Sequence, residues 1–159
     1  MKKLFILLMV LLIVSGCSTA AMDNLQWFQT VDEAIEYGLQ EENIKQQDLI
    51  GEITENGERF IFYKIKTEDG LGLGVANIIE KNGQFAWFRS DPHIIVNGSQ
   101  VSWESEIPSK KRFIIYTGIL ENEDMSIETV KGMVKPYIDS TNKIFYYVES
   151  VDKTELPEL

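Results

Sequence analysis

The spacing of hydrophobic residues changes once along this chain, from the period of about 3.6 residues typical of a helix to the period of 2 typical of a strand. Within TVDEAIEYGLQEEN, apolar or small residues recur at helical spacing: Val31, Ala34, Ile35, Gly38 and Leu39. Thr30, followed three residues later by Glu33, matches a capping box, which satisfies free amides in the first turn of a helix. The pattern predicts an amphipathic helix from about Val31 to Glu42, with its acidic face in solvent.

After this helix the period becomes 2, and three turn signals follow at regular intervals: Asn56-Gly57, Asp69-Gly70 and Asn82-Gly83. Such pairs tolerate the positive φ angles that tight hairpins require. The three glycines are 13 positions apart each time, which leaves room for one strand between successive turns. The segment therefore predicts a four-stranded antiparallel meander, with strands near 49–54, 59–67, 71–80 and 84–89.

The rest of the chain continues the strand pattern with less regular turns. Asn97-Gly98 offers a further turn, and the expected strands are 101–107, 112–120, 127–130 and 143–151. Between the last two, Gly132 to Asn142 is interpreted as a short helix or a loop, because Pro136 disfavours a long helix. Together these elements predict an α+β fold, with an N-terminal amphipathic helix packed on a largely antiparallel meander sheet.

The N-terminus has a different pattern, with two basic residues ahead of a continuous apolar run. Lys2 and Lys3 precede 11 apolar residues, Leu4 to Val14, and small residues follow. This order is typical of a bacterial export signal. The run is too short for a membrane-spanning helix, which needs about 20 apolar residues.

The end of the apolar run, Val14-Ser15-Gly16-Cys17, resembles the lipobox of bacterial lipoproteins, with Val at the position where Leu is commonest. The resemblance implies that a diacylglycerol is attached to the sulfur of Cys17 and that signal peptidase, recognising Val14, Ser15 and Gly16, cuts just before it. Two acyl chains would anchor the protein stably to a membrane. The alternative is an ordinary secretory signal cut nearby, with Cys17 incidental.

These features divide the chain into four parts: a signal peptide at 1–16, the lipidated cysteine with a short tether at 17–24, a single domain at 25–151, and a frayed tail at 152–159. Cys17 is the only cysteine. The domain therefore has no internal disulfide, even in an oxidising compartment, and its stability must come from its core.

The chain is acidic, with 15 basic and 25 acidic residues and a formal net charge of −10. Removing Lys2 and Lys3 with the signal makes the charge −12. A body of this charge is repelled by nucleic acid and by anionic headgroups. Nucleic-acid binding is therefore excluded, and the membrane is expected as a partner only through the lipid on Cys17.

Two segments resemble functional motifs only superficially. In Gly70 to Val75 the glycines alternate, whereas a dinucleotide-binding loop has a different spacing and opens a helix. We interpret Gly72 and Gly74 as strand glycines that make room for a large neighbour such as Phe60, Phe62 or Trp87. His93 is the only histidine and is interpreted as a loop or surface residue, since neither a hydrolase triad nor a zinc site can be built around it.

The acidic and aromatic residues offer further candidates. Glu104 and Glu106, either side of Ser105, are the carboxylate pair to examine for glycosidase chemistry, although a solvent-facing strand explains them equally well. The loop Glu121 to Asp124 is rich in oxygen ligands but lacks the spacing of a calcium loop. Trp27, Trp87 and Trp103 could form a binding surface, but we expect at least two of them to pack in the core.

We therefore expect a lipid-anchored protein on the extracytoplasmic face of the cell membrane, with a non-enzymatic accessory or binding role and an envelope protein as its possible partner. The sequence predicts no catalytic residue, no metal site and no cofactor. The mature part is also loosely similar to small lipid-anchored or secreted proteins of Gram-positive bacteria, in which a TVDEAI-type helix precedes a strand-rich body. The alternatives are an envelope hydrolase acting on wall glycan or peptide through paired carboxylates, and a sensor of calcium or a small ligand.

Overall fold

The computed structural model of this protein describes residues 24–68, 70–98 and 100–152. The predicted signal peptide, the predicted lipidation site at Cys17 and nearly all of the predicted tether and tail lie outside these residues. The regions predicted to be helix and strands lie almost entirely within them.

Helix α2 (Val31–Glu41) is the first regular element of the described chain. The hydroxyl of Thr30 accepts a hydrogen bond from the amide of Glu33 at 3.2 Å, and the Glu33 carboxylate accepts one from the amide of Thr30 at 3.1 Å. This reciprocal arrangement confirms the predicted capping box. The helix ends one residue earlier than predicted, and a short 3-10 turn, η2 (Gln46–Asp48), leads into the first strand.

The first sheet contains the predicted meander. Its strands β1 (Leu49–Glu55), β2 (Glu58–Thr67), β3 (Gly70–Lys81) and β4 (Gln84–Arg89) are antiparallel neighbours in that order. Asn56, Gly57, Asn82 and Gly83 have φ angles between 50° and 78°, as the turn signals predicted. A two-residue strand, β5 (Ile94–Ile95), which the sequence did not predict, pairs with β3 on the same edge as β4.

The second sheet has the order β10-β11-β7-β6, formed by Tyr137–Asp139, Ile144–Val151, Arg112–Ile119 and Val101–Glu106. Beside it, β8 (Ile127–Thr129) and β9 (Gly132–Val134) make a small hairpin. The interpretation of Gly132 to Asn142 as a helix or loop was wrong, because this segment contains β9 and β10. Gly132, with a φ of 115°, starts β9 directly after the turn that closes the hairpin.

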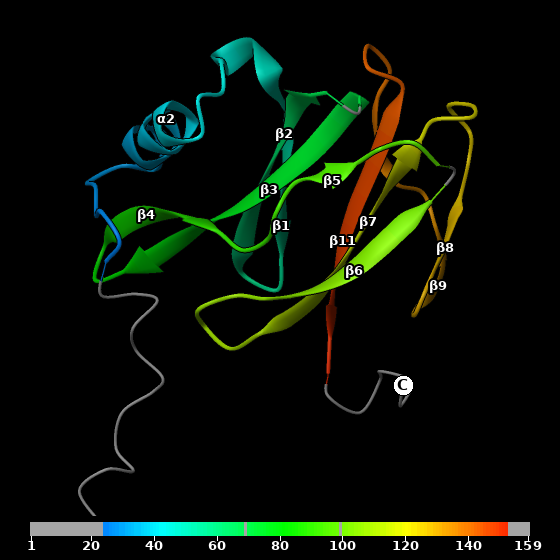
Figure 1. Cartoon of the computed structure of the whole chain (residues 1–159). Helices are drawn as coiled ribbons and strands as arrows, with labels where there is room; N and C mark the ends of the chain where they lie inside the picture. The colour runs from blue at the N-terminus through cyan, green and yellow to red at the C-terminus, as the bar shows by residue number, and fades with distance from the viewer. Residues whose placement is uncertain (1–23, 69, 99, 153–159) are drawn as a thin grey trace, which may run out of the picture.

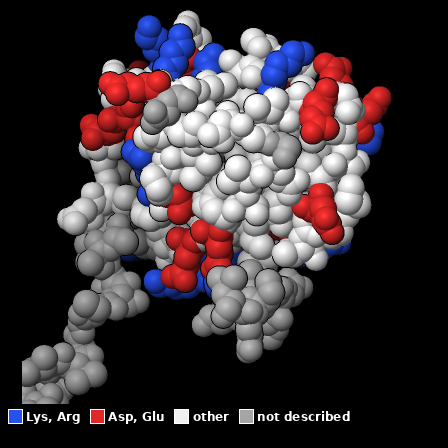
Figure 2. Space-filling view, turned by 45° about the vertical axis from the view of Figure 1, so that its right-hand side comes forward, with Lys and Arg blue, Asp and Glu red and all other residues white. Residues whose placement is uncertain are grey.

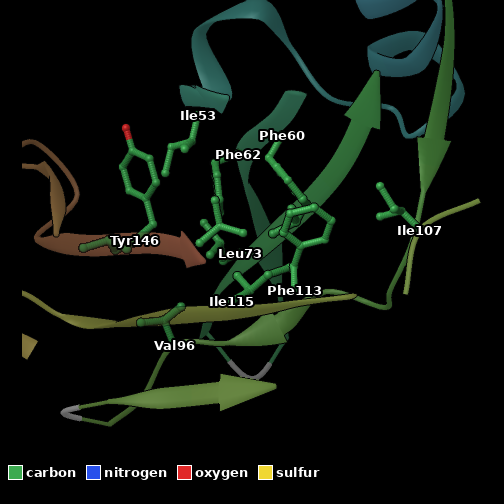
Figure 3. Close-up of a cluster of buried hydrophobic side chains, with 12 residues drawn as sticks. Ile53, Phe60, Phe62, Leu73, Val96, Ile107, Phe113, Ile115 and Tyr146 are labelled. Carbon is green, nitrogen blue, oxygen red and sulfur yellow. The ribbon is translucent and has the colours of Figure 1, made fainter. Parts of the chain in front are cut away.

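The two sheets pack face to face (Figure 1), and aromatic side chains fill the space between them (Figure 3). Phe60 of β2 meets Phe113 of β7 edge to face, with ring centroids 4.8 Å apart. The buried residues of this inner core come from both sheets and their connections: Ile53, Phe60, Phe62, Leu73, Val75, Val96, Ile107, Phe113, Ile115, Ile144, Tyr146 and Val148.

Helix α2 covers the other face of the first sheet. Ala34 and Leu39 of the helix pack with Ile61, Tyr63 and Trp87 of the sheet. A Cβ at Gly38 would lie 1.9 Å from the Trp87 ring, so only glycine lets the helix approach this closely. Strand β2 is consequently buried on both faces from Phe60 to Tyr63.

The domain is thus a sheet-dominated fold of mostly antiparallel strands, and α2 is the one α-helix in the part of the chain described. The prediction of a largely antiparallel sheet with a helix packed on it is confirmed. Over the same residues, no helix combines the length and hydrophobicity needed to cross a membrane.

Candidate functional site

Glu104 and Glu106, the predicted carboxylate pair, both lie on β6 with exposed side chains. Glu104 is ion-paired with Arg112, and Glu106 accepts a hydrogen bond from the ammonium of Lys110 at 3.2 Å. Each carboxylate therefore has its own cation. A glycosidase needs an acid and a second carboxylate facing one sugar across a cleft, and these two residues are not placed in that way.

His93 lies exposed in the connection between β4 and β5, as predicted. The alternating glycines are part of strand β3, which confirms their interpretation as strand residues. Gly74 makes room for a large neighbour, but this neighbour is Tyr63 rather than Phe60, Phe62 or Trp87. A Cβ at Gly74 would lie 2.3 Å from the Tyr63 ring.

The tryptophans and the acidic loop also have structural explanations. Trp87 is buried under the helix, and Trp103 is partly buried against the inner core, which confirms core packing for two of the three tryptophans.

In the exposed loop Glu121 to Asp124, the side chain of Asn122 accepts a hydrogen bond from the amide of Asp124 at 3.1 Å. Across the described residues, no three His, Cys, Asp or Glu side chains converge to hold a metal ion.

A pocket that sequence reasoning did not predict lies where β1 and β11 end and β7 begins. Its volume is about 530 Å³. Four cationic side chains line it, together with two carboxylates from Glu55 and Asp152. We call it the basic pocket, and its cations are Lys110, Lys111, Arg112 and Lys131.

Three of these cations are consecutive in the turn between β6 and β7. Lys110 has a φ of 66°, and its amide donates to the carbonyl of Ile107 at 2.9 Å, which closes the turn. The Lys111 ammonium reaches the neighbouring β1–β2 turn, where it donates to the carbonyl of Asn56 and forms an ion pair with Glu58, both at 2.9 Å. Local turn geometry and this cross-link therefore position the cationic run.

Ser150 connects the fourth cation to the pocket. Its amide and hydroxyl donate to Glu55 at 3.2 and 3.0 Å, and the Lys131 ammonium donates to its carbonyl oxygen at 2.5 Å. The Lys131 ammonium also lies 3.4 Å from the Ser150 hydroxyl oxygen. Glu55 and Ser150 together therefore hold Lys131 at the edge of the pocket.

Behind Lys131, a buried carboxylate fixes the turn of the β8–β9 hairpin. Glu149 is 2% exposed, and its Oε1 accepts hydrogen bonds from the Tyr116 hydroxyl at 2.5 Å and from the Val130 amide at 3.1 Å. Burial, together with the hydrogen bond to Glu149, raises the pKa of Tyr116. The tyrosine therefore stays protonated as the donor, and the turn that carries Lys131 is held against the sheet.

The sequence contained one signal for this pocket, the basic run Lys110-Lys111-Arg112 within an acidic chain. No family model matches the chain, and comparisons with curated proteins and with solved structures return no match. The features that bear on function are therefore the lipobox-like motif at Cys17 and the geometry of the basic pocket.

Proposed function

We propose that this chain is the precursor of a lipoprotein anchored through Cys17 to the extracytoplasmic face of the cell membrane, where its folded domain has a non-enzymatic accessory or binding role. The observation that carries the proposal is the lipobox-like Val14-Ser15-Gly16-Cys17 after a short apolar run. The acidic charge of the chain agrees with it, because such a body would be held at the membrane by its lipid rather than by headgroup charge.

The start of the folded domain supports the same proposal. Phe28 pairs with Phe85 through two backbone hydrogen bonds of 2.8 and 2.9 Å, which ties the N-terminal segment to β4. Phe28 follows Cys17 by 11 positions, a span of at most about 40 Å when fully extended. A domain anchored at Cys17 would therefore act close to the membrane surface.

A binding role is supported by the molecular surface. Figure 2 shows a broad face whose centre carries no charged side chain, while acidic and basic groups lie around its periphery. Depletion of charge at the centre, with a charged rim, is the composition expected of a protein interface. The domain also exposes large hydrophobic side chains, namely Ile119, Val130, Met133 and Tyr137.

The anchoring proposal is tested with Cys17→Ala, expressed in a bacterial host and labelled metabolically with a fatty acid. The variant should incorporate no label and should no longer partition into the detergent phase, because the acceptor sulfur is missing. Ser18→Ala, which changes the next residue and leaves the sulfur in place, should be labelled like the parent. Lipid labelling of Cys17→Ala at the parental level would contradict the proposal.

The non-enzymatic character of this role is tested separately by incubating the purified protein with wall glycan and peptide fragments and measuring cleavage. No fragment should be cleaved. Cleavage by the parent that is lost in Glu104→Gln or Glu106→Gln would replace the binding role with the hydrolase alternative. The ion pairs that these carboxylates form with Arg112 and Lys110 would then have to be reconciled with a catalytic role.

We also propose that the domain is best classified as α+β. The supporting observation is that α2 packs on the outer face of the meander, chiefly over β4, through Ala34, Leu39 and the Gly38–Trp87 contact. In an all-β sandwich that face would be left to solvent.

A further inference from the structure

We propose that the basic pocket is a binding site for a phosphorylated ligand with two or more negative charges. This inference deepens the binding role proposed above and rests on it. The pocket brings together cations from the β6–β7 turn and from the β8–β9 turn, beside a hydroxyl from the end of β11.

The distribution of charge is the first argument. The chain has 15 Lys and Arg residues, and 12 remain in the described segments once Lys2, Lys3 and Lys153 are set aside. Four of these 12 line one pocket of a protein whose net charge is −10. Glu55 and Asp152 share the lining, so four cations less two carboxylates leave a formal excess of two positive charges. An anionic ligand would complement this excess.

The carboxylate partners of these cations do not prevent ligand binding. Lys110, Lys111 and Arg112 pair with glutamates that lie outside the pocket lining, namely Glu106, Glu58 and Glu104. The Lys110 pair is the most exposed, with 64% and 51% of the two side chains accessible. Exposed pairs of this kind are weak, so a ligand carrying several charges can compete for Lys110. The Lys111 and Arg112 pairs are less exposed, and these two cations would contact the ligand while still paired.

The donors present are those that phosphate oxygens accept. Lys110, Lys111 and Lys131 supply ammonium groups, and Arg112 supplies a guanidinium whose planar donors suit phosphate. The Ser150 hydroxyl already donates to Glu55, so its contribution is indirect: the Ser150 carbonyl holds the Lys131 ammonium at the pocket. Donors on several sides favour an anion with several oxygens over a single carboxylate.

The size and character of the pocket limit the ligand further. A volume of about 530 Å³ lies within the range of small-molecule sites, roughly 300–1,000 Å³. Its lining is mostly charged and polar, and Val151 is its one aliphatic residue. The pocket therefore suits a compact phosphorylated group and not an acyl chain.

The experiment measures binding of inorganic tripolyphosphate to the full-length protein by isothermal titration calorimetry, in metal-free buffer at about 0.15 M ionic strength. A second probe is glycerol 3-phosphate, the soluble headgroup of phosphatidic acid, whose phosphate monoester carries close to two negative charges at neutral pH. The test variant is Lys110→Gln combined with Lys131→Gln. The matched control is Lys135→Gln combined with Lys45→Gln, which removes the same charge outside the pocket.

Tripolyphosphate should bind the parent, and the pocket variant should weaken binding by about tenfold or more because charged hydrogen bonds are lost. The control variant should change the affinity less than about threefold. Tighter binding of tripolyphosphate would indicate a free phosphorylated ligand, and tighter binding of glycerol 3-phosphate a lipid headgroup; either supports the site.

Two results would overturn the proposal: failure of both probes to bind the parent, or equal weakening by the pocket and control variants, which would reflect net charge alone. Thermal unfolding of each variant confirms that it is folded. The lipid labelling of Cys17 does not depend on these lysines. Absence of ligand binding at the pocket therefore leaves the anchoring proposal intact, and absence of lipid label leaves the binding experiment interpretable.

Discussion

At the scale of single residues, close packing in this domain depends on aromatic rings that lie over glycines. The Tyr63 ring covers Gly74, Trp87 covers Gly38, and the Tyr146 hydroxyl lies 2.2 Å from the position of a Cβ on Gly51. At each of these three positions a side chain would collide with a ring. Protein interiors are packed as densely as organic crystals, so such collisions are not relieved cheaply.

Gly74→Ala should lower the free energy of unfolding by about 1–3 kcal/mol, the usual cost of overpacking a core. Gly72→Ala on the same strand is the matched control, because its Cβ would meet its nearest neighbours at ordinary distances of 3.5 to 3.6 Å. It should change stability by less than about 0.5 kcal/mol. Urea denaturation measures both, and equal effects of the two substitutions would contradict the packing argument.

Tyr63 also makes stability dependent on alkaline pH. Its hydroxyl is buried without a hydrogen-bond partner among the described residues. Burial raises the Tyr63 pKa above its ordinary value of 10.0, and Glu42 adds to the rise while Arg89 opposes it. Above pH 10 the unfolded tyrosine releases its proton while the folded one keeps it, so stability falls as pH rises.

Tyr63→Phe should therefore lose less stability than the parent between about pH 9 and 11, and should be no less stable at pH 7 because the removed hydroxyl has no partner. Chemical denaturation across this range provides the measurement. Tyr137→Phe, at a position that is 49% exposed, serves as control and should follow the parent. The same alkaline slope in Tyr63→Phe and the parent would argue against this role of Tyr63.

At the scale of elements, the β8–β9 hairpin depends on Glu149 more than on its own strand pairing. The hairpin has only three residue pairs, and the Val130 amide at its turn donates to Glu149. Ile127 is the hairpin's buried contribution to the outer cluster on the second sheet, with Met125 and Val134 packed beside it. Removing the carboxylate leaves the Tyr116 hydroxyl without its buried acceptor.

Glu149→Ala should therefore cost about 1–3 kcal/mol and should speed amide hydrogen exchange first in the hairpin, at residues 127–134. Glu128→Ala, which changes an exposed glutamate of the same hairpin, should leave exchange unchanged. Exchange followed by mass spectrometry distinguishes the two variants. A uniform increase over both sheets in Glu149→Ala would show that the carboxylate supports the whole fold and not the hairpin.

Elements with local signals were predictable from the sequence, and elements formed by tertiary pairing were not. Thr30 and Glu33 fix the start of α2, and the Asn-Gly turns fix the ends of the meander strands. Strand β5, in contrast, exists because Ile94 and Ile95 reach the free edge of β3, and two residues carry no detectable period. Pro136, which disfavours a helix, lies in the connection between β9 and β10 and so interrupts neither of these short strands.

The basic pocket was beyond sequence reasoning for a different reason. Its cations are local only at Lys110 to Arg112. Ser150 joins them through the pairing of β11 with β7, and Lys131 through the packing of the hairpin on the second sheet. The burial of Glu149, in contrast, was predictable from the sequence. This residue alternates with Phe145, Tyr147 and Val151 on one side of β11, so a buried acid was already implied by the strand pattern.

At the scale of the whole molecule, four layers enclose three hydrophobic clusters. The order is helix α2, the first sheet, the second sheet and the β8–β9 hairpin. Only the inner core contacts both sheets, and Phe60 and Phe113 meet across it. Damage to this core should therefore destabilise the whole domain, whereas damage to an outer layer should stay local.

Phe113→Ala should cost about 3–5 kcal/mol, because it removes a fully buried ring. Hydrogen exchange should accelerate together in β2, β3, β7 and β11. Ile127→Ala is the comparison, since its side chain is equally buried but belongs to the outer cluster, and its effect should be largest in the hairpin. Independent loosening of one sheet in Phe113→Ala would show that the sheets unfold as separate units.

The contact between Gly38 and Trp87 also gives the protein a natural optical probe. The Trp87 indole lies between helix and sheet, with the Tyr63 ring centroid 5.7 Å away. At this distance, light absorbed by the tyrosine is transferred efficiently to the indole, and a buried indole emits at shorter wavelength than one in water. Detachment of α2 would therefore shift the Trp87 emission to the red, and replacing Trp27 and Trp103 by Phe would isolate this signal without an added label.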